Sequence, residues 1–295
     1  VAILSPTRYE WTVLDFALWT AGAFAVPIYD SSSAKQIEWI LQDSESVAVI
    51  VDSALSADRV RGATLTAPPP IWVMDDGLLD ALVAEGAGVA DEILTTRSAA
   101  VTPQDPATIV YTSGTTGRPK GCVITHENLM FIARTLVVGT GPVVTTPSAR
   151  TVLFLPLAHV LGRGAQVFSA EGGMQVAHCP NGKLLPGDML SFRPTYLVGV
   201  PRIFEKIYNG AHHHAHGDPA RGRLLQRLGD RKHRAGKLED VGFQQHLGAR
   251  GVDGINQRRT RASVPATPGG TACTRNGRAA TPRRWHRRAW CRWIR

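Results

Sequence analysis

Cysteine is scarce in this sequence, and the cysteines that occur are not spaced to act together. The four residues, Cys122, Cys179, Cys273 and Cys291, form no Cys-x-x-Cys pair. Their wide spacing disfavours a zinc site or a disulfide framework and is typical of a reducing compartment.

Long apolar runs are missing too. No stretch approaches the about 18 apolar residues of a membrane-spanning helix, so we expect no such helix.

The first residues lack both features of a secretory leader. The chain opens VAILSP, with neither an initiating methionine nor a basic segment ahead of an apolar run. We therefore expect no signal peptide. We also expect the chain to start within a strand, as a fragment of a longer protein would.

Basic residues are few in most of the chain and crowded at its end. Residues 1–215 carry 14 Lys and Arg against 19 Asp and Glu, whereas residues 216–295 carry 19 against 5. Over 213–295 long apolar runs and periodicity disappear, and Arg, Gly, Ala, Pro and Trp dominate. We expect 213–295 to be a disordered basic tail, with the composition of a GC-rich gene translated out of frame. The alternative is a functional tail that binds nucleic acid or an anionic membrane.

A run of histidines marks the start of this tail. It comprises His212, His213, His214 and His216. Consecutive histidines without a second cluster of ligands are typical of a solvated helix end. We expect no metal site here.

Short apolar runs alternate with amphipathic segments before the tail, a pattern that predicts a layered α/β fold. The run VAVIV at 47–51 is continuously apolar, as parallel strands covered on both faces are. Ser33 followed by Gln36 has the spacing of a helix capping box. We expect strands at 1–4, 26–29, 47–51, 71–74, 107–111, 122–125, 151–160, 174–178 and 195–200. We expect helices within 8–25, after Ser33, at 75–86, from 125 or 126 onward, and from Pro201.

The segment YTSGTTGRPKG at 111–121 has the composition of a loop that wraps a polyphosphate. Glycines let the backbone approach a ligand, while amide and hydroxyl groups donate to phosphate oxygens and a cation offsets the charge. The glycines are Gly114, Gly117 and Gly121, the hydroxyls Thr112, Ser113, Thr115 and Thr116, and the cation Lys120, with Arg118 at the rim. Lys120 follows a proline and precedes a glycine, so the spacing is not that of the common NTPase loop. A flexible surface loop is the alternative interpretation.

All eleven residues of YTSGTTGRPKG resemble the phosphate-loop signature of the acyl-adenylate-forming (AMP-binding) superfamily. Two further segments, LPLAHVLGR at 155–163 and VGVPRIFEK at 198–206, resemble its long-chain fatty-acid–CoA ligase branch. The N-terminal segment is similar to the opening of that branch. The resemblance covers residues 1–212, which we predict to form an incomplete N-terminal domain of layered α/β sheets.

The resemblance implies ATP-dependent activation of a long-chain fatty acid to acyl-AMP and transfer to coenzyme A. ATP, Mg²⁺ and coenzyme A are then the implied cofactors and co-substrates, with the fatty acid as partner. Specific nucleic-acid binding is not implied. The implied location is cytoplasmic, with peripheral contact to the inner face of the membrane as an option. The implied phosphate-binding residues are Thr112, Ser113, Gly114, Thr115, Thr116, Gly117 and Lys120.

Other residues match the implied acyl site. His159 aligns with a position beside the acyl carboxylate and is the candidate catalytic residue, and the alternative is a core histidine at a strand end. Gly199, Val200 and Pro201 match a segment that borders the acyl site. Arg163 is expected either to pair with an acidic group or to lie near the nucleotide, and Arg202 to form a structural ion pair.

Several motifs of the family are not found in this sequence. Residues 213–295 contain neither Tyr-Gly-x-Thr-Glu, which contacts adenine and Mg²⁺ in the family, nor the ribose-binding Thr-Gly-Asp, nor the C-terminal domain with its catalytic lysine. We therefore expect a truncated form with little or no acyl-CoA synthesis by itself. Two alternatives stay open: a fatty-acyl-AMP ligase that loads a carrier protein, and an Arg-rich protein that binds nucleic acid or an anionic membrane.

Overall fold

The computed structural model describes the backbone of residues 1–112 and 118–215, with side chains up to residue 209. The chain divides into two units, Val1–Val200 and Pro201–Arg295. Residues 216–295, which make up most of the predicted tail, lie outside the described residues. Within the described part, no helix combines the length and apolar character needed to cross a bilayer.

Four short parallel strands form the first sheet of unit 1. They are β1 (Ala2–Leu4), β2 (Val26–Ile28), β3 (Val49–Val51) and β4 (Ile71–Val73), in the order β2-β1-β3-β4. Successive side chains of a strand point to opposite faces, and both faces of this sheet are covered. Leu4 packs with Ile37 in one buried cluster, whereas Ile3 packs with Trp11 in another. Double coverage explains why the strands are apolar throughout.

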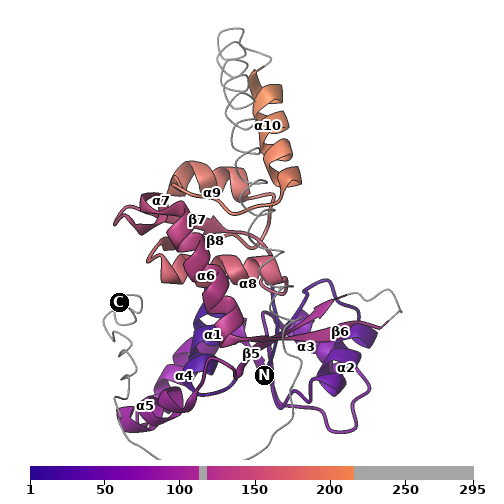
Figure 1. Ribbon diagram of the computed structural model, residues 1–295. Coiled ribbons are helices and arrows are strands. Elements are labelled where there is room, and N and C mark those ends of the chain that lie inside the picture. The colour runs from indigo at the N-terminus through magenta and orange to yellow at the C-terminus, as the bar shows by residue number, and fades with distance from the viewer. Residues whose placement is uncertain (113–117, 216–295) are drawn as a thin grey trace, which may run out of the picture. The chain divides into compact units, whose positions relative to one another are not determined.

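Helices connect these strands and cover the sheet. They are α1 (Tyr9–Thr20), α2 (Ala34–Asp43) and α3 (Ala54–Arg61), all labelled in Figure 1. The predicted capping box of α2 is present: the Ser33 hydroxyl accepts from the Gln36 amide, and the Gln36 side chain accepts from the Ser33 amide. After β4 come a short 3-10 helix, η1 (Met74–Asp76), and the helices α4 (Leu78–Gly86) and α5 (Asp91–Ala100).

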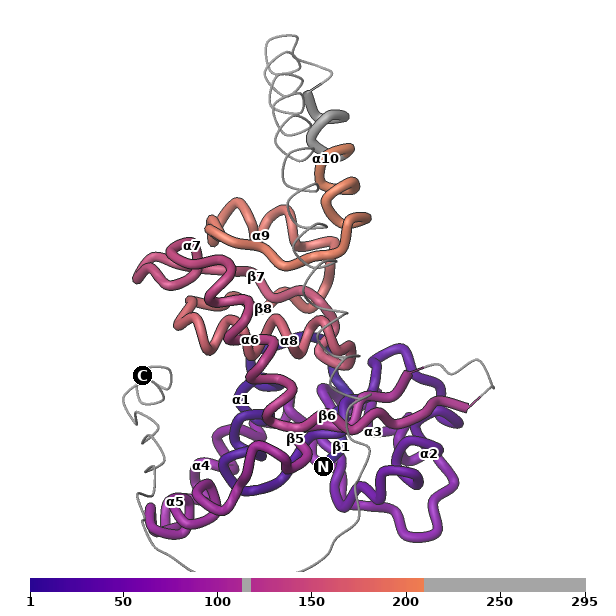
Figure 2. The backbone as a smooth tube through the Cα atoms, in the orientation of Figure 1, coloured from indigo at the N-terminus to yellow at the C-terminus, as the bar shows by residue number. Residues whose placement is uncertain are grey.

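An antiparallel hairpin joins the edge of the sheet at β2. It consists of β5 (Pro106–Thr112) and β6 (Lys120–Thr125), and Thr108 donates its hydroxyl to the Ala25 carbonyl at 2.8 Å. The predicted return strand is thereby confirmed. Figure 2 shows the two strands running together toward residues 113–117. Thr125 then caps the next helix through Asn128, as its position at the predicted helix start indicated.

The rest of unit 1 is a second α/β layer. It contains α6 (His126–Thr140), α7 (Pro142–Thr145), β7 (Arg150–Leu153), α8 (Val160–Glu171), β8 (Gln175–His178) and α9 (Leu185–Phe192). Strands β7 and β8 pair in parallel, and α8 crosses over between them. Phe168 of α8 is fully buried in the cluster that joins this layer to Trp19 of α1. In the other unit, α10 (Pro201–Ala215) starts at proline, as predicted.

Two strand predictions are wrong. The apolar run at 151–160 is a strand only to Leu153; the chain then turns, with the His159 amide donating to the Pro156 carbonyl, and enters α8. A proline cannot continue a ladder and favours such a turn. The segment 195–200 forms one isolated bridge, between Tyr196 and Thr151, and no strand. The mixed α/β class itself is confirmed.

Candidate functional site

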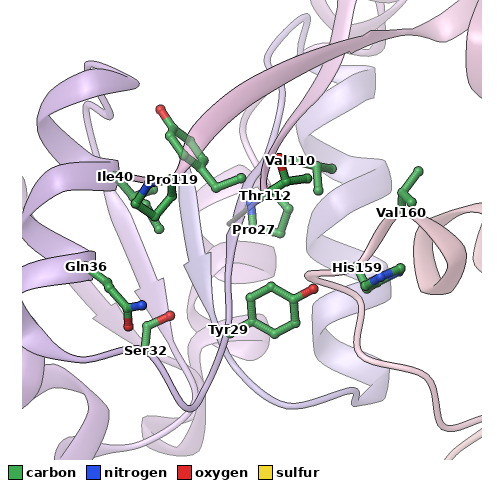
Figure 3. A pocket seen from close by; sticks show the side chains of 11 residues that line it. Pro27, Tyr29, Ser32, Gln36, Ile40, Val110, Thr112, Pro119, His159 and Val160 are labelled. Atoms are coloured by element: carbon green, nitrogen blue, oxygen red, sulfur yellow. The ribbon is translucent and has the colours of Figure 1, made fainter. Parts of the chain in front are cut away.

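A pocket of about 340 Å³ opens in unit 1 beside the carboxyl end of β2 (Figure 3). In open α/β sheets, ligands bind outside the carboxyl ends of parallel strands. The lining residues come from β2 and the loop after it, from α2, from the hairpin and from the start of α8. They are Pro27, Tyr29, Ser32, Gln36, Ile40, Val110, Tyr111, Thr112, Pro119, His159 and Val160.

Two helix N-termini face this pocket. Ser32 and Gln36 belong to the start of α2, and His159 and Val160 to the start of α8. Figure 3 shows these two pairs on opposite walls. The first amides of a helix carry a partial positive charge and lack intrahelical partners. The pocket is therefore suited to a negatively charged ligand.

His159 is the N-cap of α8 and not a core residue. Its imidazole is exposed, and Nδ1 accepts a hydrogen bond from the Leu161 amide at 3.1 Å. Because Nδ1 is an acceptor, a neutral His159 carries its proton on Nε2. The structure thus brings His159 to the pocket with an Nε2–H group to donate. The alternative, a core histidine at the end of a strand, is wrong.

The hairpin brings the described ends of the glycine-rich loop to the pocket. Thr112 lines the pocket, and Lys120 pairs with Thr112 across the hairpin. Directly opposed residues of an antiparallel pair project from the same face, so the exposed Lys120 leaves the hairpin on the side of Thr112. The predicted ligands Ser113, Gly114, Thr115, Thr116 and Gly117 lie outside the described residues.

Gly121 has a different role from the one expected. Its φ is not positive, so backbone freedom does not explain the glycine. A β-carbon here would lie 2.8 Å from Ile109 Cγ2 and 3.1 Å from Tyr111 Cζ. The Tyr111 ring crosses the space that a side chain would fill. Gly121 therefore serves packing across the hairpin.

Tyr29 is a pocket residue that the sequence analysis missed. It follows β2 directly, and Figure 3 shows its hydroxyl pointing to the His159 side of the pocket. Partial burial raises the pKa of its phenol, so the hydroxyl keeps its proton at neutral pH. The signal available in the sequence was its position just past a parallel strand.

Arg163 forms a structural ion pair, the first of the two roles expected for it. Its guanidinium is fully buried, pairs with Asp15 at 2.9 Å and lies against the rings of Trp11 and Trp19 at 5.1 and 5.5 Å. Burial raises the pKa of Asp15, while Arg163 and a hydrogen bond from Gln166 oppose that rise. These contacts hold α8 against α1 and so position the start of α8 in unit 1.

The remaining acyl-site candidates, Gly199, Val200 and Pro201, stay predictions. Gly199 and Val200 end unit 1 and are not among the described lining residues of the pocket. Pro201 starts α10 in the other unit, as does Arg202, which is exposed. Over residues 1–112 and 118–209, whose side chains the structure describes, no group of three His, Cys, Asp or Glu side chains could hold a metal ion. We therefore assign no Mg²⁺ ligand.

Comparison with protein families decides the ancestry of the chain. Residues 1–251 match the model of the family described as AMP-binding enzyme. The chain belongs to this family. The matched residues include those that form the hairpin, the pocket lining and α8.

Curated relatives place the chain nearer one branch. It is 41% identical over 230 residues to the long-chain-fatty-acid–CoA ligase FadD15 of Mycobacterium bovis, covering 76% of this chain and 38% of that protein. It is 29% identical over 227 residues to long-chain-fatty-acid–CoA ligase 5 of Rattus norvegicus, covering 71% and 33%. The chain therefore spans well under half the length of these relatives.

A solved structure supports the fold. The o-succinylbenzoate CoA synthetase MenE of Bacillus subtilis, in complex with the acyl-adenylate intermediate, is 21% identical with a TM-score of 0.53. The match covers 70% of this chain and 50% of that one. The described α/β layers thus have the fold of an adenylate-forming enzyme.

Proposed function

We propose that this chain is part of a long-chain fatty-acid–CoA ligase and that the pocket beside β2 holds the phosphates of ATP next to the reacting carboxylate. The observation that carries the proposal is the meeting of Thr112 with two helix N-termini at one pocket. The family and the names of the relatives support the reaction class. ATP, a fatty acid and coenzyme A are the substrates that go with it.

The groups at the pocket suit the charge that the first step creates. A fatty-acid carboxylate attacks the α-phosphorus of ATP, an acyl–phosphate bond forms, and the bond to pyrophosphate breaks. Negative charge grows on the leaving pyrophosphate, and enzymes stabilise such charge with fixed donors and cations. The partial positive charge at the starts of α2 and α8, the Thr112 hydroxyl and the Lys120 ammonium group supply this stabilisation.

His159 and Tyr29 have a second role in this proposal. With Nδ1 occupied by the Leu161 amide, the Nε2–H of His159 donates to a carboxylate oxygen and orients it. The Tyr29 hydroxyl is the second donor on that side. Coenzyme A thiolate then attacks the acyl carbon, and AMP leaves. For this second step we assign no residue of the chain.

Binding is the measurement that tests the proposal, because the chain spans a minor part of its relatives. Titration calorimetry should detect ATP and tripolyphosphate binding to the wild type. Lys120→Ala should lower the affinity for each of these ligands about tenfold or more, the usual effect of losing one charged hydrogen bond. Lys183→Ala removes an exposed lysine outside the pocket lining and is the control. Equal affinities for the two variants would contradict the proposal. Acyl-CoA synthesis by these 295 residues alone is not expected, which stays a prediction.

A further inference from the structure

Helix α2 holds both strands of the hairpin through two of its side chains. The Tyr111 hydroxyl of β5 donates to Asp43 Oδ2 at 2.6 Å. The Trp39 indole N–H donates to the carbonyl of Pro119, just before β6, at 2.8 Å. The Arg118 guanidinium lies 4.8 Å above the Trp39 ring. Trp39 and Asp43 are one helical turn apart and so share a face of α2.

These contacts fall next to the two described residues proposed to bind phosphate. Tyr111 precedes Thr112, and Pro119 precedes Lys120. Thr112 and Lys120 are paired directly across the hairpin. The Tyr111 ring reaches α2 because Gly121 leaves the space open. Burial and the bond to Asp43 both raise the pKa of Tyr111, so the phenol stays a donor at neutral pH.

The helix that makes these contacts is itself fixed. Ile37, Ile40 and Leu41 are buried against the first sheet, and the capping box closes the start of the helix. The same helix supplies Gln36 and Ile40 to the pocket wall. The spacing between the positive end of α2 and Thr112 is therefore set by Trp39 and Asp43.

We propose that Trp39 and Asp43 are positioning residues that hold Thr112 and Lys120 at the pocket. The proposal rests on the function proposed above. Neither residue is among the described residues lining the pocket, so each acts through the hairpin. If Asp43 acted only through its negative charge, removing that charge would strengthen anion binding. If Asp43 positions the hairpin, losing its hydrogen bond to Tyr111 weakens anion binding. The two explanations therefore predict opposite changes in affinity.

A pair of variants at residue 43 separates hydrogen bonding from charge. Asp43→Asn and Asp43→Ala both remove the charge, but asparagine keeps an oxygen that can accept from Tyr111. By titration calorimetry with tripolyphosphate, Asp43→Ala should bind about fivefold more weakly than Asp43→Asn, the size expected for one hydrogen bond between neutral groups. Equal affinities, or tighter binding by Asp43→Ala, would overturn the positioning role of Asp43.

A second pair tests the indole. Trp39→Phe keeps an aromatic ring under Arg118 but removes the donor to Pro119, and about a fivefold loss of tripolyphosphate affinity is expected. Trp72→Phe, on β4 at the far edge of the sheet, is the control and should bind like the wild type. An unchanged affinity in Trp39→Phe would refute the positioning role of Trp39.

Hydrogen–deuterium exchange separates failure of this proposal from failure of the proposed function. In Asp43→Ala and Trp39→Phe, amides from Lys120 to Val123 should exchange faster than in the wild type, while those of β1 and β3 stay unchanged. Unchanged exchange in both variants would refute the hold of α2 on the hairpin. A wild type without affinity for tripolyphosphate would contradict the proposed function, and the positioning role with it, even if the exchange result holds.

Discussion

Two glycines of α8, two positions apart, should respond in opposite ways to the same substitution. A β-carbon on Gly162 would overlap the carbonyl oxygen of Pro156 and lie 2.8 Å from its carbonyl carbon. These are backbone atoms of the turn before the helix, so they cannot rotate away. A β-carbon on Gly164 has no heavy atom within 4 Å apart from its chain neighbours and helix backbone.

The sizes of the two effects follow from these surroundings. Overpacking a core destabilises a protein by about 1–3 kcal/mol. Because the atoms in the way belong to the backbone, we expect Gly162→Ala to cost about 3 kcal/mol. For a domain of about 150–250 residues this lowers Tm by about 6–12 °C. Gly164→Ala adds helix propensity and should stabilise by about 0.5–1 kcal/mol. Thermal unfolding followed by circular dichroism measures both, and equal Tm values for the two variants would refute the reasoning.

Further predictions concern the buried ion pair and His178, the last residue of β8. Arg163→Met should lower the free energy of unfolding, measured with denaturant, by about 3–5 kcal/mol because it leaves the buried Asp15 unpaired. Adding Asp15→Leu should recover most of this loss. No recovery would argue against a stabilising role of the pair. Burial lowers the pKa of His178 to about 4, below the about 6.5 of an unfolded chain. The unfolded chain therefore binds the extra proton, and stability that is complete above about pH 6.5 falls by on the order of 3 kcal/mol as the pH drops toward 4. His178→Gln should flatten this slope, and an unchanged slope would assign it to other groups.

Local patterns in the sequence predicted much of the first sheet and the hairpin. The capping box at Ser33 and Gln36 and the cap at Thr125 were readable because cap and partner lie three residues apart. The strands β1 and β3 were readable because doubly covered parallel strands are apolar throughout. The alternation of these elements also indicated the α/β class.

Contacts between distant residues could not be read in this way. The run at 151–160 is apolar for three separate reasons: a strand to Leu153, a packed turn, and the start of α8. Periodicity does not distinguish these cases over so few residues. The Trp39 bond to Pro119 joins residues 80 positions apart. Tyr29 and His159 likewise line one pocket because the start of α8 lies beside the carboxyl end of β2.

The most direct test of the central claim is a crystal structure of the chain grown with a non-hydrolysable ATP analogue. We predict triphosphate density in the pocket beside β2, within hydrogen-bonding distance of Thr112 and between the starts of α2 and α8. A nucleotide bound elsewhere on the chain, with this pocket filled by solvent, would contradict the account.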